Sequence, residues 1–234
     1  MTRSAPAARP SRLRFVALLA VTGLAASAGP AVAADQPPQQ WDGLERRQSK
    51  ALDHVYVRPG VQFTAYQRVR LDPVTVEFDK NWDPNHGTRS LSGRLGSSDI
   101  QRIRADLAAE FRKVLADTLA KGGYPLVEDD GDEVLRVTAS MVNVYITAPA
   151  RSATATSATY VMESGRITVF LELRDSVTGQ VLARAVDTTQ GSRQGQLQWA
   201  GSVSNSAEAR QAFMEWATQL RKALDNVNGK APPR

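Results

Sequence analysis

Residues 98–118 read SDIQRIRADLAAEFRKVLADT, and the spacing within this stretch decides the fold class. Apolar side chains, with a threonine at the end, recur every three or four positions, and this spacing places them in one stripe along an α-helix. The stripe consists of Ile100, Ile103, Leu107, Phe111, Val114, Leu115 and Thr118. Ser98 and Gln101 have the spacing of a capping box, and Gly122-Gly123 would end the helix. A helix with one stripe covers one surface, so the rest of the chain must supply that surface.

The segments that follow this helix have the patterns of β-strands. Residues 134–146 carry apolar side chains on both parities, which is typical of a strand in the interior of a sheet. Residues 166–174 alternate strictly and lead through a turn, with Gly179 at its left-handed position, into a return strand over 180–189. Four side chains of the first strand of this hairpin are expected to face inward: Ile167, Val169, Leu171 and Leu173.

Two further strands are predicted nearer the N-terminus of the domain. Residues 66–78 alternate, but the apolar parity changes across Asp72-Pro73. Because proline cannot donate to a ladder, this change predicts a bulge or an edge position. A short strand is predicted at 124–127, before the acidic stretch 128–133.

A second apolar stripe near the C-terminus predicts a second helix, which Asn205 would cap together with Glu208. The stripe consists of Ala209, Phe213, Trp216, Leu220, Leu224 and Val227. The fold class that follows is α+β: a mainly antiparallel sheet of about 4–5 strands with two amphipathic helices on one face.

The first 34 residues have the pattern of a secretory signal peptide. Four arginines precede the apolar stretch 15–28, which is too short for a comfortable membrane span, and Ala31-Val32-Ala33 is a cleavage site. No twin arginine stands in the n-region, residues 1–14, so we expect the general secretory route and a periplasmic or secreted location. No later window is long and apolar enough to cross a bilayer, so no transmembrane segment is expected in the mature chain.

The expected domain organisation follows from this leader. Residues 1–34 are the cleaved signal peptide, 35–65 a spacer and N-terminal arm, and 66–228 a single α+β domain. Residues 229–234 are expected to be a disordered tail. The stretch 147–158 is rich in Ala, Ser and Thr and is predicted to be a mobile loop.

Charge and cysteine content exclude several classes of function. The whole chain has 29 basic and 24 acidic residues, and loss of the four leader arginines leaves 25 against 24, a net charge of +1. A nearly neutral chain has no general electrostatic attraction to nucleic acid, so no such partner is expected. The absence of cysteine excludes disulfides, thiol nucleophiles and the lipid anchor of bacterial lipoproteins.

The candidate site residues are few. His54 follows an aspartate in the arm and His86 lies in a turn, so each could contact a ligand, but neither belongs to a zinc-binding spacing. Arg193 and Trp199 lie in the glycine-rich stretch 191–201, which could be a flexible binding loop. The alternative for all four is an ordinary surface position.

The sequence carries no recognised motif for catalysis or for cofactor binding. The acidic stretch 128–133 lacks the spacing of a calcium loop, and turn chemistry explains it. No G-x-S-x-G, S-x-x-K, G-x-G-x-x-G or Walker sequence occurs, so no catalytic residue, metal or cofactor is assigned.

Several short motifs resemble an exported bacterial family of domains of unknown function, number thirty-three-thirteen. They are 53–60 (DHVYVRPG), Tyr66 with 71–74 (LDPV), 173–183 (LRDSVTGQVLA), and Trp216-Ala217 with 220–224 (LRKAL). The resemblance covers about residues 41–228 and implies export to the cell envelope, frequent lipidation and no assigned activity. The missing lipoprotein cysteine is a departure from that family.

These observations leave three interpretations of function. The first is a non-catalytic periplasmic or envelope-associated protein that binds an envelope protein or a second copy of itself. The alternative is a hydrolase of envelope polymer or glycan, with carboxylates or a histidine that meet only in the folded chain. The third is a small-ligand carrier, which requires an apolar cavity between sheet and helices; the occupied helix stripes favour a filled core instead.

Overall fold

The computed structural model describes residues 37–86, 94–147, 161–190 and 204–230, which form two long helices and one sheet. The sheet has eight strands in the order β1-β2-β3-β8-β7-β6-β4, with β5 also paired to β6. The strands are β1 (Gln40–Trp41), β2 (Leu44–Arg47), β3 (His54–Val57), β4 (Arg68–Leu71), β5 (Thr75–Phe78), β6 (Val134–Thr147), β7 (Val161–Asp175) and β8 (Val181–Gln190). A single 3-10 turn, η1 (Phe63–Ala65), joins β3 to β4.

The α+β class is confirmed, but the expected number of 4–5 strands is wrong because the sheet has eight. Residues 40–57, expected to be part of an arm, form β1, β2 and β3 and extend the sheet from β8. These strands are two to four residues long, too short for an alternating pattern to be recognised. Residues 124–127 contribute only an isolated bridge between Leu126 and Val69.

The parity change at Asp72-Pro73 separates two strands. β4 and β5 lie on either side of it, and both pair in parallel with the long strand β6. All other pairs are antiparallel. Since β7 holds the other side of β6, the interior position expected for residues 134–146 is confirmed. The β7–β8 hairpin and the positive φ of Gly179 (69°) are confirmed as well.

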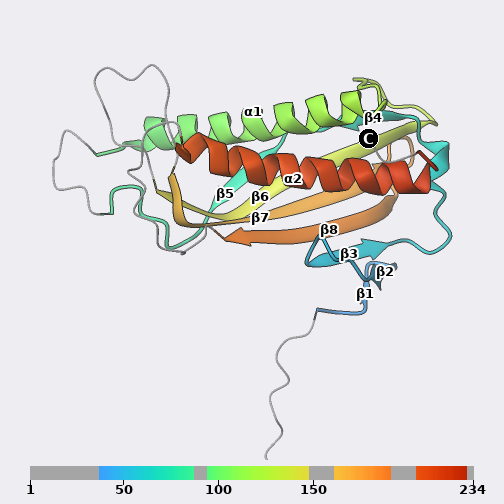
Figure 1. Ribbon diagram of the computed structural model, residues 1–234, viewed down its shortest axis with the longest axis horizontal. Helices are drawn as coiled ribbons and strands as arrows, with labels where there is room; N and C mark the ends of the chain where they lie inside the picture. The colour runs from blue at the N-terminus through green and yellow to red at the C-terminus, as the bar shows by residue number, and fades with distance from the viewer. Residues whose placement is uncertain (1–36, 87–93, 148–160, 191–203, 231–234) are drawn as a thin grey trace, which may run out of the picture. The chain divides into compact units, whose positions relative to one another are not determined.

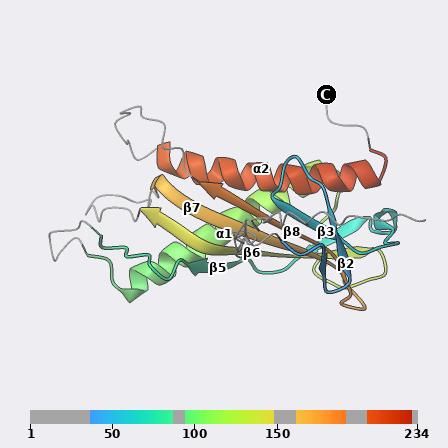
Figure 2. The same cartoon turned by 90° about the horizontal axis from the view of Figure 1, so that it is seen from below.

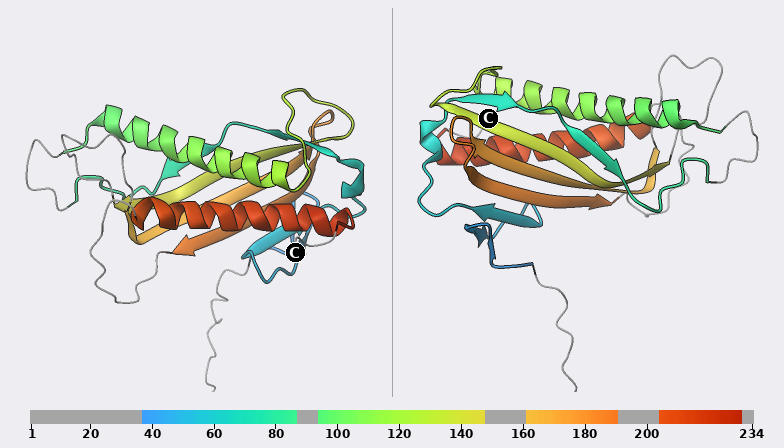
Figure 3. Two further views of the ribbon diagram at one scale, coloured as in Figure 1. Left: turned by 45° about the horizontal axis from the view of Figure 1, so that its top comes forward. Right: turned by 180° about the vertical axis from the view of Figure 1, so that it is seen from behind.

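Both helices, α1 (Ser97–Lys121) and α2 (Ser204–Val227), cover the same face of the sheet (Figures 1 and 3). The expected capping box of Ser98 and Gln101 is wrong: α1 begins after Gly96, whose N–H donates to the Asp99 carboxylate at 2.9 Å. Asp99 caps the helix instead, because its carboxylate accepts a hydrogen bond from the backbone three residues earlier. Its negative charge is also stabilised by the positive end of the helix dipole. Within the described residues, neither helix combines the length and apolar character that crossing a bilayer requires.

The core lies between this sheet face and the two helices. The apolar stripes of the helices are buried there, and the Phe111 ring lies 4.9 Å from that of Phe213 and 5.8 Å from that of Trp216. Val227, expected in the second stripe, is instead 44% exposed because it lies in the last turn, at the mouth of a groove described below.

The opposite face of the sheet carries polar and charged side chains, with a small apolar cover supplied by the first strands. The ring of Trp41 in β1 packs edge-on against that of Tyr56, with 5.5 Å between the ring centroids, and its centroid lies 5.7 Å from that of Phe170. The Arg184 guanidinium lies 4.5 Å above the same tryptophan ring and pairs with Glu172 at 2.7 Å. The short N-terminal strands are thus held on the sheet by aromatic and ionic contacts rather than by a large core.

Candidate binding site

A groove of about 640 Å³ runs between α2 and the sheet, along the inner side of β3 and β8. Figure 1 shows β3 and β8 below α2, on the side of that helix away from α1, and Figure 2 shows the same two strands next to α2 after a turn of 90°. The walls of the groove are mostly apolar, with Val55 and Val57 on β3, Leu171 and Leu173 on β7, and Leu220 on α2. The volume lies within the range of small-molecule sites. The sequence interpretation of an entirely filled interior is therefore wrong on this side of the molecule.

Small side chains explain why this space is open. β8 presents Ala183 and Ala185 to the interior, where the neighbouring strand β7 presents Leu171 and Leu173. Across the groove, α2 places Ala223 at the rim. The large apolar side chains of α2 point toward β7 and α1. The side of α2 that faces β8 is therefore opposite alanines, which are too small to fill the space between helix and strand.

Hydrogen bonds fix β3 at both ends, which sets the width of the groove. At one end the Asp187 carboxylate accepts from the Trp216 indole at 2.7 Å and from the backbone N–H of Asp53 at 3.0 Å. The Asp53 carboxylate in turn accepts from the N–H of Thr188 at 3.0 Å. At the other end the Arg58 Nε donates to the Val181 carbonyl at 2.6 Å. The helix and both strands are therefore cross-linked around the groove rather than free to close over it.

The charged groups of the groove are all positive. Arg47, Arg58, Arg184 and Lys222 line it, and no acidic side chain does so among the described residues. The Arg184 guanidinium faces away, paired with Glu172 and Asp42 on the other side of the sheet. Arg58 bonds to carbonyl oxygens and Arg47 pairs with Glu45 at 3.0 Å. Lys222 is exposed and makes no ion pair within the described part of the chain.

The two histidines are not brought together. His54 begins β3, half-buried, with its Nδ1 3.5 Å from an Arg46 nitrogen. His86 is exposed in the turn after β5, and β8, β7 and β6 separate the two strands concerned. Neither lines the groove. Arg193 and Trp199 lie outside the described residues, and so does the loop expected over 147–158, except that its first residue, Thr147, is the last residue of β6.

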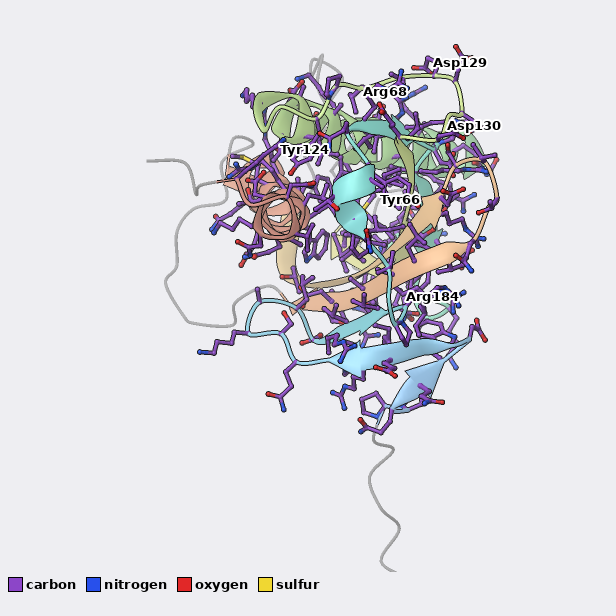
Figure 4. All side chains as sticks on the ribbon, turned by 90° about the vertical axis from the view of Figure 1, so that its right-hand side faces the viewer. Tyr66, Arg68, Tyr124, Asp129, Asp130 and Arg184 are labelled. Atoms are coloured by element: carbon purple, nitrogen blue, oxygen red, sulfur yellow. The ribbon has the colours of Figure 1, made fainter. Side chains whose placement is uncertain are left out.

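The acidic stretch 128–133 is held by its own neighbours. Asp130 pairs with Arg70, Glu128 lies 4.0 Å from Arg112, and the Gly131 N–H donates to the Ser176 hydroxyl at 3.0 Å. Figure 4 shows Asp129 and Asp130 on a turn at the margin of the molecule, far from Arg184. In the part of the chain that the structure describes, no three His, Asp or Glu side chains gather as a metal site would require.

The pKa values of two tyrosines are shifted away from pH 7. Burial, together with the hydrogen bond that Tyr66 donates to Asp175 at 2.9 Å, raises the pKa of Tyr66 to about 12. Burial likewise raises the pKa of Tyr124 to about 12, with its hydroxyl donating to Asp225 at 3.0 Å. General acid–base chemistry needs pKa values shifted toward the working pH, so these tyrosines are placed to hold elements together rather than to move protons.

A second hollow lies at the far edge of the sheet, between β5 and α1. It measures about 620 Å³ and is lined by Val76, Phe78 and Arg104 among others. The Arg104 guanidinium lies 5.6 Å from the Phe78 ring, and its buried Nε has no hydrogen-bond partner within the described residues. Compared with the first groove, it has no wall of strands on its outer side.

Comparison with known proteins gives one match in sequence. The model of a family described as "Protein of unknown function (DUF3313)" matches residues 34–220, and this is the family that the sequence motifs resemble. No curated protein matches at a significant level.

Solved structures give similarities with low TM-scores. PelC from Paraburkholderia phytofirmans, described as a dodecamer, is 14% identical with a TM-score of 0.32, covering 69% of this chain and 96% of that chain. Protein XCC0632 from Xanthomonas campestris is 10% identical at a TM-score of 0.41, covering 74% and 91%. A minor lipoprotein from Acinetobacter baumannii is 12% identical at 0.33, covering 70% and 94%.

Proposed function

We propose, from the premise that this chain belongs to the DUF3313 family, that it is a non-catalytic binding protein of the cell envelope. The observation that carries the proposal is the apolar groove of about 640 Å³ between α2 and strands β3 and β8. A gap of this kind leaves apolar surface in contact with water, which a bound apolar molecule would remove.

Two further observations support binding over catalysis. Both histidines lie outside the groove, and its lining has cations but no carboxylate within the described residues. Glycoside hydrolysis requires a pair of carboxyl groups flanking the substrate, so the groove does not favour the alternative hydrolase.

Binding of a neutral apolar dye tests the groove directly. We expect N-phenyl-naphthylamine to gain fluorescence with the wild-type protein, and to gain much less with Ala185→Leu, which fills the groove from β8. Ala223→Leu fills it from α2 and should give the same loss independently. Ala109→Leu, at an exposed position of α1, is the matched control and should bind the dye as the wild type does. Equal fluorescence for all four proteins would overturn the proposal.

The envelope location rests on the leader expected over residues 1–34. Expression of the full chain with a C-terminal tag, followed by cell fractionation and mass spectrometry, tests it. We expect a periplasmic or secreted chain that begins at Ala34 or Asp35. An unprocessed chain in the cytosolic fraction would contradict this location.

The expected partner, an envelope protein or a second copy of this chain, is a separate part of the proposal. Size-exclusion chromatography with light scattering, combined with crosslinking in cells, tests it. A monomer that captures no envelope protein would remove this part and leave the groove as the binding site.

A further inference from the structure

We propose that the groove binds the anion of a long-chain fatty acid, with the hydrocarbon chain along β3 and β8 and the carboxylate at Lys222. This inference rests on the proposed function and names the ligand of the same groove. Three features carry it: the size of the groove, the absence of free backbone partners in its walls, and the sign of its charge.

The size fits one hydrocarbon chain. A water molecule occupies roughly 30 Å³ in the liquid, and a methylene group has about the same volume. A groove of 640 Å³ therefore has room for about twenty such groups. A single chain with its head group fits within this volume, whereas a phospholipid with two chains exceeds it.

The walls favour a hydrocarbon over a peptide. β3 is paired on both sides, with β2 and with β8, so its backbone offers no free edge along the groove. An extended peptide laid against Val55, Ala185 and Leu171 would leave N–H and C=O groups without partners. A methylene chain has no such groups, and each methylene that it buries in the groove favours binding by removing apolar surface from water.

The charge favours an anionic head group. Lys222 lines the groove next to Ala223 at its rim, and its ammonium is exposed without an ion pair within the described residues. Arg58 adds positive charge to the lining, Arg47 does so while paired with Glu45 outside it, and no acidic side chain lines the groove within the described residues. A lysine can lay its aliphatic stem along an apolar wall while its charge stays in water, which suits a carboxylate at the mouth.

Titration calorimetry with dodecanoate below its micelle concentration tests the inference. We expect the wild-type protein to bind dodecanoate more tightly than dodecyl maltoside, which has the same chain and a neutral head. Lys222→Glu should weaken dodecanoate binding about ten-fold, because it replaces an attraction with a repulsion near the surface. The same variant should leave maltoside binding unchanged, and Lys222→Arg should retain dodecanoate affinity.

The control is Lys80→Glu, which makes the same charge change at an exposed position after β5, across the sheet from the groove. It should bind dodecanoate as the wild type does. If dodecanoate and maltoside bind equally and Lys222→Glu changes neither, the fatty-acid inference is overturned while the groove remains a binding site. If neither amphiphile binds and the neutral dye also fails, the proposed function falls with it.

Discussion

The two helices cover one face of the same sheet, yet the space beneath them differs on its two sides. Toward α1, large side chains fill the interior: Phe111, Leu115 and Met141 are at most 1% exposed. Toward β3 and β8, alanines at 183, 185 and 223 leave the groove. Side-chain size therefore contributes to the difference between the two sides: large side chains fill one, and alanines leave the other open.

Truncation in the filled side should have the largest effect. Phe111→Ala removes a fully buried ring that contacts Phe213 and Trp216. We expect the free energy of unfolding to fall by about 3–5 kcal/mol. Urea denaturation followed by circular dichroism measures it. Leu52→Ala, at a half-buried position that lines the groove, should lower it far less; equal losses would contradict the comparison.

The second-largest effect is expected at Asp187, whose carboxylate links α2 to the start of β3. Asp187→Ala removes the acceptor of both the Trp216 indole and the Asp53 N–H. Because the indole N–H of the buried Trp216 would lose its partner, we expect a loss of about 2 kcal/mol. Asp117→Ala, which breaks an exposed pair with Lys113 in α1, is the control and should cost much less. Thermal denaturation of the two variants side by side distinguishes them.

One helix allows the comparison to be made with a single type of substitution. Ala217 of α2 is 0% exposed in the filled side, and Ala217→Leu should cost about 1–3 kcal/mol through overpacking. Ala223→Leu, in the same helix at the rim of the groove, should change the free energy of unfolding by less than about 0.5 kcal/mol. The difference between the two urea midpoints is the measurement. Similar costs would mean that the groove is closed in solution.

Acid should have a smaller effect through Asp72. Burial alone would raise the pKa of Asp72, but hydrogen bonds from Thr138 at 2.6 Å and from Arg136 outweigh it and lower the pKa. A lowered pKa in the folded state stabilises the protein above the unfolded value, about 4, and this stabilisation is lost as the pH falls through the folded value. Asp72→Asn should therefore reduce the pH dependence of the unfolding free energy below pH 4, by less than about 1 kcal/mol. Asp129→Asn, which removes one carboxylate from an exposed turn, is the matched control.

The filled side could be predicted from the sequence better than the hollow side. Regular spacing at Ile103, Leu107 and Phe111 identified α1, and strict alternation identified β7, because each pattern repeats over many residues. Alanines at 183 and 185 satisfy the same alternation as leucines, so the pattern gives their direction but not the gap they leave. That gap depends on β3, a strand of four residues that has no recognisable period of its own.

The candidate site was accordingly missed. His54 and His86 attract attention because histidine titrates near neutrality, yet neither lines the groove. The useful signal was compositional: small residues at alternate positions of a buried strand, together with Ala223 beside Lys222 on a helix.

The way in which β4 and β5 share one side of β6 has a consequence for aggregation. Each is four residues long, and Pro73 between them has no N–H to offer another chain. At the other margin the sheet ends in β1, which is two residues long. Strands from other chains extend a sheet into fibrils by pairing with a long, unbroken edge strand. Among its described strands this sheet has no long edge strand of that kind. The short strands at both edges therefore limit edge-to-edge growth in a protein that also exposes an apolar groove to water.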